Sequence, residues 1–326
     1  MALYLSAQKR SVISDDDSQG RIDLEEAQPR DLMEIFTDQQ RRPVAWLRHG
    51  RCGHRVMIVS IPKAGTYLYA YLLQHLGLEH IYLHLSEDHL SDYRFATRDE
   101  MRLEPEEFRR DFPLAQSLSL VREGQLVVGH LAHSAPTAAL LNGWKVLFLY
   151  RDLRDAAISH MRFFAETGRG GPETAVWGQR PDGPEKLDRF LELHGSSLIP
   201  SCCDMIAWML EPQVLSVSYE SLMGDLGADA QAATISDITS WLDLTPPLKS
   251  PAELLKSVVG VNTKTWSGRR TVRERYWNGD VERRFDGLGG NQANRLLAER
   301  AELKDPHSRW PALLASVAVP AAGASD

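Results

Sequence analysis

The chain has 326 residues, of which 43% are hydrophobic, and this is enough to bury a substantial core in one large domain or two small ones. Its formal charge is −7, which argues against a nucleic-acid partner because proteins that bind nucleic acids are usually basic. Its three cysteines, Cys52, Cys202 and Cys203, form neither a disulfide framework nor a C-x-x-C metal spacing.

The two ends of the chain differ in composition from its body. Residues 1–28 are polar and acidic, which is typical of a disordered arm, and residues 313–326 form an Ala/Gly/Pro tail. We therefore predict one folded domain over residues 29–312. No apolar stretch reaches the roughly 18 residues of a membrane span, and the amino end does not resemble a signal peptide. These features predict a cytoplasmic protein with no membrane partner.

Apolar runs and helical patterns alternate along the body of the chain. Strands are predicted over residues 54–61, 125–130, 145–151 and 213–219, and helices over residues 65–78, 155–166 and 202–210. Continuous apolar strands separated by helices predict a parallel sheet that is covered on both faces. In such α/β sheets, ligands bind outside the carboxyl ends of the strands.

Two long segments interrupt this alternation. Residues 85–112 are rich in charge, and residues 168–183 are rich in glycine and proline. Both are long for ordinary connections, so each is predicted to be either a lid or acceptor-binding loop, or a variable surface insertion.

The first strand–helix junction, "SIPKAGT", has the features of an anion site. Backbone N–H groups at a helix start converge on one point, and the helix dipole favours negative charge there. Gly65 permits a close approach of the backbone, Lys63 adds a positive charge, and Thr66 adds a hydroxyl group. The spacing is not that of a Walker A loop, in which the lysine follows the second glycine. The alternative interpretation is a plain turn with a solvated lysine.

A second junction, "YRDLRDAAIS", suggests another phosphate contact. Arg151 ends a predicted strand, Asp155 is a candidate N-cap for the next helix, and Ser159 lies within that helix. A guanidinium and a hydroxyl near the carboxyl end of a strand can hold a phosphate group. The alternative is a capped helix with a surface charge.

Together the two junctions resemble the motifs S-x-P-K-[ST]-G-T-T-W and R-[ND]-x-x-D-x-x-x-S of the PAPS-dependent sulfotransferases, where PAPS is 3′-phosphoadenosine 5′-phosphosulfate. The resemblance implies a P-loop-NTPase-like three-layer α/β fold with a central parallel sheet. It implies that the 5′-phosphosulfate is held by Lys63, Ala64, Gly65, Thr66 and Tyr67. It further implies that Arg151 and Ser159 bind the 3′-phosphate, that Tyr219 lies near the adenine, and that the late arginines Arg269 and Arg270 close over the 3′-phosphate.

The chain departs from the family pattern at three positions. Tyr67 and Leu68 replace the second threonine and the tryptophan of the first motif, so one hydroxyl and one stacking surface are lost. Val128 stands where the family's K-T-H-L-P stretch has lysine. The adenine side of the motif therefore lacks its stacking tryptophan, and one supporting cation next to the histidine is missing.

His130 is the candidate general base. It ends a predicted strand, and "VVGHLAHSA" resembles the K-T-H-L-P stretch in which the histidine is the base. His133 is the rival, and the alternative for His130 is a structural histidine. An unperturbed histidine predicts loss of activity on the acid side with a pKa near 6.5. Lys63 is predicted to be the second catalytic residue, where it would stabilise the leaving phosphate.

The resulting functional hypothesis is transfer of a sulfonate group from PAPS to a hydroxyl or amine of a small-molecule acceptor, with PAP as the product and no metal. One alternative is a P-loop-type small-molecule kinase. The other is a non-enzymatic nucleotide-binding protein of the same fold, for which the changes at Tyr67, Leu68 and Val128 are the best support.

Overall fold

The computed structural model describes residues 33–37, 43–47, 53–103, 105–243, 250–258 and 273–302. The predicted arm, the predicted tail and the arginines Arg269 and Arg270 lie outside the described residues. Two strands near the amino end, β1 (Met33–Thr37) and β2 (Pro43–Leu47), pair with each other in an antiparallel hairpin. Neither belongs to the main sheet.

The main sheet has seven strands in the order β6-β5-β4-β7-β3-β8-β9. Their bounds are β3 (Val56–Ser60), β4 (Glu79–Leu85), β5 (Leu90–Asp92), β6 (Arg109–Arg110), β7 (Gln125–Gly129), β8 (Lys145–Tyr150) and β9 (Val214–Ser218). Strands β4, β7, β3, β8 and β9 run parallel, whereas β5 and β6 add an antiparallel edge. The predicted α/β class with a central parallel sheet is therefore confirmed.

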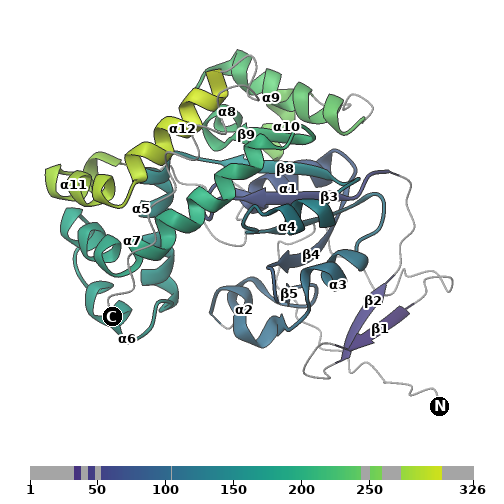
Figure 1. Cartoon of the computed structure of the whole chain (residues 1–326), viewed down its shortest axis with the longest axis horizontal. Coiled ribbons are helices and arrows are strands. Elements are labelled where there is room, and N and C mark those ends of the chain that lie inside the picture. The colour runs from purple at the N-terminus through teal and green to yellow at the C-terminus, as the bar shows by residue number, and fades with distance from the viewer. Residues whose placement is uncertain are drawn as a thin grey trace.

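Helices flank this sheet (Figure 1). They are α1 (Thr66–His75), α2 (Arg98–Leu103), α3 (Leu114–Ser119), α4 (Ala135–Leu140), α5 (Leu153–Thr167), α6 (Pro172–Trp177), α7 (Pro184–Ile206), α8 (Tyr219–Met223), α9 (Ala228–Trp241), α10 (Pro251–Val258), α11 (Gly279–Gly287) and α12 (Gly290–Glu302). Short 3₁₀ turns are η1 (Pro105–Phe108), η2 (Ala207–Leu210) and η3 (Arg273–Arg275). Helix α1 packs on β3, β4 and β7, while α5, α6 and α11 contact α7 in a separate group.

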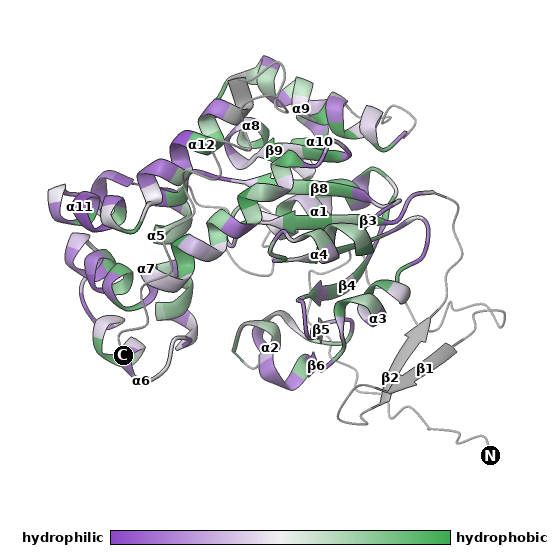
Figure 2. Cartoon of the chain, in the orientation of Figure 1, coloured by the Kyte–Doolittle hydropathy of each residue, from purple (hydrophilic) through white to green (hydrophobic). Residues whose placement is uncertain are grey.

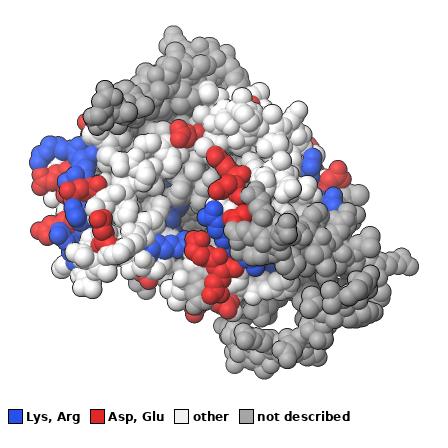
Figure 3. Space-filling model, turned by 60° about the horizontal axis from the view of Figure 1, so that its bottom comes forward, with Lys and Arg blue, Asp and Glu red and all other residues white. Residues whose placement is uncertain are grey.

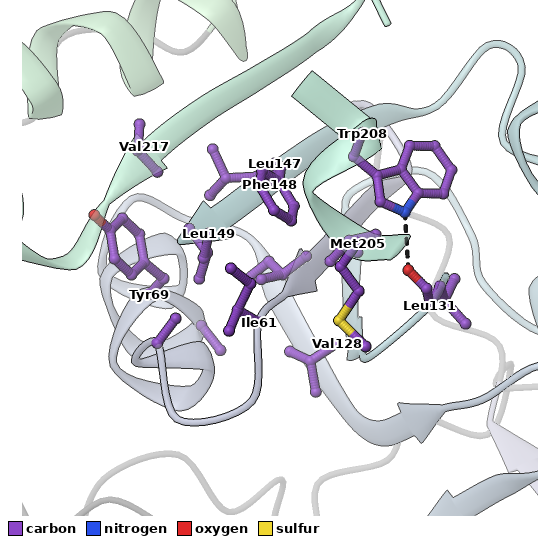
Figure 4. Close-up of a cluster of buried hydrophobic side chains, with 14 of the residues drawn as sticks. Ile61, Tyr69, Val128, Leu131, Leu147, Phe148, Leu149, Met205, Trp208 and Val217 are labelled. Atoms are coloured by element: carbon purple, nitrogen blue, oxygen red, sulfur yellow. Dashed lines mark hydrogen bonds between the residues drawn. The ribbon is translucent and has the colours of Figure 1, made fainter. Parts of the chain in front are cut away.

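The core lies around the middle of the sheet, because these strands are covered on both faces. Every residue of β3 and β7 is buried, and Figure 2 shows β3 and β8 as hydrophobic, while hydrophilic residues gather on outer helices such as α11. Two side chains of the core bind backbone next to the predicted site residues. The Trp208 indole N–H donates to the Leu131 carbonyl at 2.9 Å (Figure 4). The Tyr69 hydroxyl donates to the Ser218 carbonyl at 2.7 Å. The core thus fixes the backbone at the carboxyl ends of β7 and β9.

Candidate active site

The turn from β3 to α1 has the backbone that an anion-binding loop needs. Lys63 has a φ of 71° and Gly65 a φ of 94°, so both lie in the left-handed region. Gly65 is the N-cap of α1 and provides no side-chain cap, which leaves the first N–H groups of the helix for a ligand. Ala64 is fully buried beneath the turn. A Cβ on Gly65 would lie 2.9 Å from Cδ2 of Tyr219, so the ring of that tyrosine closes tightly over the glycine.

His130 is bound to the strand that leads into this turn. Its Nδ1 donates to the Ser60 carbonyl at 2.7 Å and also lies 3.3 Å from the Ser60 hydroxyl. Because a carbonyl can only accept, Nδ1 carries the proton, and Nε2 of the neutral ring keeps its lone pair. The Ser60 hydroxyl in turn lies 2.6 Å from that of Thr66. Ser60, a residue that sequence reasoning did not single out, thus connects the base candidate to the loop.

Arg151 and Tyr219 lie together on the opposite side of the turn. The Arg151 guanidinium carbon is 4.2 Å from the ring centroid of Tyr219, and Nη1 donates to the Lys63 carbonyl at 3.4 Å. Arg151 is only 8% exposed and follows β8 directly, while Tyr219 begins α8 directly after β9. The structure therefore brings Lys63, Gly65, Arg151 and Tyr219 together at the carboxyl ends of β3, β8 and β9.

A family comparison identifies the family of the chain. The sulfotransferase domain family matches residues 54–253, which is more than half of the chain. The chain belongs to the sulfotransferase domain family. The P-loop-like fold and the family inferred from the two motifs are thereby confirmed.

Similar proteins were also found among solved structures. One is the mouse sulfotransferase SULT7A1 complexed with PAP, which is 16% identical, with a TM-score of 0.49 over 77% of this chain and 91% of that one. Another is retinol dehydratase in complex with androsterone and the inactive cofactor PAP, which is 14% identical, with a TM-score of 0.43 over 73% and 80% of the two chains. No curated protein matches the chain by sequence.

The start of α5 differs from the sequence prediction in this sulfotransferase-family chain. The N-cap is Asp152, whose carboxylate accepts from the Arg154 N–H at 2.8 Å, and not Asp155, which lies in the first turn. Both aspartates bind Arg273, each at 2.9 Å from its Nη2. Ser159 lies in the second turn of α5 and is half-buried, and within the described residues its hydroxyl makes no hydrogen bond.

Tyr67 points toward the other half of the sheet. Its hydroxyl lies 3.0 Å from Nδ1 of His84, near the end of β4, and the His84 ring lies edge-on to His130 at 4.8 Å between centroids. Burial raises the pKa of Tyr67 well above its usual value, so the phenol stays protonated. The motif position that lost its threonine thus supplies a hydrogen-bonded aromatic side chain next to the base candidate. Sequence reasoning missed His84, although the alternation in "EHIYLHL" indicates a strand.

The histidines around the loop are held neutral by their surroundings. Burial lowers the pKa of His130 to about 4, assisted by the Lys63 charge, while the hydrogen bond to Ser60 opposes this shift. Burial also lowers the pKa of His160 to about 3, again assisted by Lys63 and by His130. The sequence-based value near 6.5 for the base is therefore too high for the unliganded protein, because it ignored desolvation. His160 is thus a further histidine that interacts electrostatically with two residues of the candidate site, and sequence reasoning missed it.

His133, the rival base, has a different setting. Its Nε2 lies 2.8 Å from the Glu211 carboxylate, and its ring lies edge-on to Trp208 at 5.0 Å. It therefore has an acidic partner, whereas Nδ1 of His130 binds the backbone of Ser60, next to the loop.

Metal-ligand clusters and membrane-spanning helices are both absent from the described ranges. Among those residues, no group of three or more histidine, cysteine, aspartate or glutamate side chains could hold a metal ion. No helix of the described chain is long and apolar enough to span a membrane.

Proposed function

We propose that this member of the sulfotransferase family transfers a sulfonate group from PAPS to a hydroxyl or amine of a small-molecule acceptor. The observation that carries the proposal is the position of Lys63 between two sets of side chains. Arg151 and Tyr219 contact the loop from the ends of β8 and β9, and His130, directly after β7, binds Ser60 at the end of β3, next to the loop. The first set, Arg151 and Tyr219, suits a nucleotide, and His130 on the other side suits the acceptor.

The nucleotide side suits an anionic, aromatic co-substrate. Gly65 lets a phosphate group approach the backbone N–H groups at the start of α1, where the helix dipole favours negative charge. Arg151 supplies a guanidinium that is mostly buried and stacked on Tyr219. In our proposal Lys63, Ala64, Gly65, Thr66 and Tyr67 hold the 5′-phosphosulfate. Arg151 and Ser159 hold the 3′-phosphate, and Tyr219 lies near the adenine. Arg269 and Arg270 complete the 3′-phosphate site.

The reaction needs one proton acceptor and one cation. Nε2 of His130 takes the proton from the acceptor group, because Nδ1 already donates to Ser60. The acceptor atom forms its bond to sulfur while the bond between sulfur and the phosphate oxygen breaks, and PAP leaves with that electron pair. The Lys63 ammonium stabilises the charge that develops on the departing phosphate oxygen. We assign the base to His130 and not to His133 because His130 binds Ser60 next to the loop, whereas His133 binds Glu211.

The first test is binding of the nucleotide. PAP should raise the melting temperature of the protein, because a ligand that binds only the native state stabilises it. Adenosine 5′-phosphosulfate, which lacks the 3′-phosphate, should bind much less tightly. Folded protein whose melting temperature does not change at saturating PAP would contradict the proposal, and equal affinity for the two nucleotides would remove the role of Arg151 and Ser159.

The second test separates the alternatives. The comparisons give no support to the kinase alternative, and stabilisation by ATP with Mg²⁺ but not by PAP would revive it. Incubation with labelled PAPS and candidate acceptors, followed by mass analysis for an added sulfonate group, tests the non-enzymatic alternative. We also propose a cytoplasmic location, which the free thiols of Cys202 and Cys203 support because cytosolic thiols are kept reduced.

A further inference from the structure

A second cationic group lies close to Lys63, and the reaction steps above do not use it. The guanidinium carbon of Arg169 lies 4.9 Å from the ring centroid of Phe163. The Lys63 ammonium lies 4.2 Å from the same centroid. Both distances are measured to the centroid of the Phe163 ring. The Lys63 ammonium and the Arg169 guanidinium carbon can therefore be no farther apart than the sum of the two distances. Arg169 is therefore near the place where the sulfonate group is transferred.

The backbone of Arg169 is held in place. The residue follows Gly168, the C-cap of α5, and its carbonyl accepts from the Thr174 hydroxyl at 2.6 Å. The next residue, Gly170, packs so closely that a Cβ there would lie 2.6 Å from that hydroxyl and 2.8 Å from the Phe164 ring. The first part of the segment 168–183, which was predicted to be a loop or an insertion, is thus packed against α5 and α6.

The guanidinium of Arg169 has more donors than the protein satisfies. Its Nε is buried and has no hydrogen-bond partner in the described part of the chain. Nη2 donates to the Met101 carbonyl at 3.5 Å, at the limit of a hydrogen bond. Within the same residues, no carboxylate forms an ion pair with it. A mostly enclosed guanidinium without a carboxylate partner leaves a positive charge uncompensated, so the oxyanion of a ligand would be favoured beside it.

The neighbours of Arg169 place it on the acceptor side. Its charge lowers the pKa of both Tyr67 and Tyr93, and a side-chain hydrogen bond between Arg169 and Tyr93 lowers the pKa of Tyr93 further, against the larger effect of burial, which raises both. Tyr67 binds His84 of β4, and Tyr93 directly follows β5, so both lie across β3 from Arg151 and Tyr219. Figure 3 shows basic side chains in the recessed middle of one face, with acidic side chains beside them.

We propose that the acceptor carries an oxyanion, either a carboxylate or a phosphate, which Arg169 binds while the nucleophilic group of the acceptor reaches His130. The inference rests on the proposed function because it identifies the acceptor class of the same site. The Nη groups of the guanidinium would bind the oxyanion, and the Phe163 ring beneath the guanidinium would keep its plane in position. Arg169 is then the residue that selects the acceptor.

The test compares three probes that differ in charge. Calorimetry on PAP-saturated protein measures binding of para-hydroxyphenylacetate, its neutral methyl ester, and para-hydroxyphenyl phosphate. We expect at least one anion to bind about tenfold to a hundredfold more tightly than the ester, as for a hydrogen bond to a charged group. The stronger of the two anions identifies the group as carboxylate or phosphate. Arg169→Gln should remove the preference, and Arg180→Gln, an exposed arginine of the same segment, should keep it.

Several results would contradict an anion site at Arg169. Equal binding of all three probes, binding of none, or an unchanged preference in Arg169→Gln shows that there is no anion site at Arg169. PAP binding is measured first on each variant, which also reports whether the variant has folded. A wild-type protein that does not bind PAP contradicts the proposed function instead, and the same three probes then decide the anion site on the unliganded protein.

Discussion

His130 is oriented by one backbone acceptor, and this contact determines which ring nitrogen is available for chemistry. Nδ1 donates to the carbonyl of Ser60 at 2.7 Å, so Nε2 keeps the lone pair that the proposed base would use. We expect His130→Ala to lower the sulfonation rate by about 10²–10⁴-fold, the typical contribution of a general base. The affinity for PAP, measured by calorimetry, should change little, because no role on the nucleotide side is assigned to the imidazole.

His133→Ala is the matched control for this variant. It removes a histidine three positions away, whose partner is Glu211. Its effect on the rate should be at least tenfold smaller. If His133→Ala is inactive and His130→Ala is active, the acceptor approaches from a different side and the assignment is wrong.

Lys63 should matter for turnover more than for folding. Its ammonium lies over Phe163, and its loss leaves no cavity in the core. We expect Lys63→Ala to lower kcat by about 10²–10³-fold, by analogy with the loss of a donor to a developing oxyanion. Lys256→Ala, at an exposed position of α10, is the control and should retain full activity. An unchanged kcat with a large loss of PAPS affinity would make Lys63 a binding residue only.

The protonation of His130 can be observed directly. Its pKa is lowered to about 4 in the unliganded protein because the ring is buried and Lys63 lies near it. NMR titration of histidine-labelled protein should therefore place the midpoint of His130 well below the ordinary value of about 6.5. Bound PAP should raise the midpoint, because nearby negative charge favours the protonated ring. A midpoint near 6.5 without PAP would show that the ring is more solvated than the structure indicates.

At the scale of the element, the β3–α1 turn depends on glycine for two separate reasons. Gly65 has a φ of 94°, and its missing Cβ leaves room for the Tyr219 ring. Gly77 has a φ of 97°, and a Cβ added there would have no atom within 4 Å, so it has the same backbone requirement without the contact. We expect both Gly65→Ala and Gly77→Ala to lower the free energy of unfolding by about 1 kcal/mol or more.

Only Gly65→Ala should also weaken PAP binding, because the added methyl group displaces Tyr219 and narrows the approach to the backbone. Urea unfolding and calorimetry on the two variants separate the effects. A Gly65→Ala protein that binds PAP as tightly as Gly77→Ala would show that the ring adjusts at no cost to the site.

Long apolar elements were predictable from the sequence, because burial on both faces requires continuous apolar runs. This is why β3, β7, β8 and β9 lie where their patterns place them, each bounded within one or two residues. Helix α7 was predicted only in its last part, since Pro200 lies inside it and normally ends a helix. Strands β5 and β6 have three and two residues, which is too short for the alternation of apolar and polar residues in a strand to be recognised.

The candidate site was predictable only where its residues are close together in the sequence and form a motif. The loop at Lys63 and the strand end at Arg151 could be read because each is a contiguous stretch. His84, His160 and Arg169 reach the site from separate elements, so their proximity depends on strand order and helix packing. The pKa of His130 escaped prediction for the same reason, since desolvation is a property of the folded state.

At the scale of the whole molecule, the buried histidines make stability depend on pH. The pKa values of His130 and His160 are lowered to about 4 and about 3. Below about pH 6.5 the unfolded chain binds protons at these residues and the folded chain does not. The free energy of unfolding should therefore fall as the pH is lowered from 7 to 5, by at most about 1.4 kcal/mol per pH unit for each histidine.

His160→Leu tests this dependence because it removes one of the two groups. Urea unfolding at pH 7 and pH 5 should show a smaller loss of stability in the variant than in the wild-type protein. Equal losses in both proteins would mean that His160 is not the group that takes up the proton.

The strand order has a consequence for how acceptor preference can change. Strand β3 lies between β7 and β8, so β4 and β5 lie beyond β7 on one side of the strand that leads to Lys63, and β8 and β9 lie on the other. Under the proposed assignment, acceptor selectivity and nucleotide affinity depend on different halves of the sheet. A library confined to residues 85–112 and 168–183, which leaves out His84 because it binds Tyr67 of the loop, would then diversify the acceptors while a single PAP-binding assay serves every variant. In evolutionary terms, the proposed assignment implies that new acceptors can be acquired by drift on one half of the sheet without rebuilding the donor site.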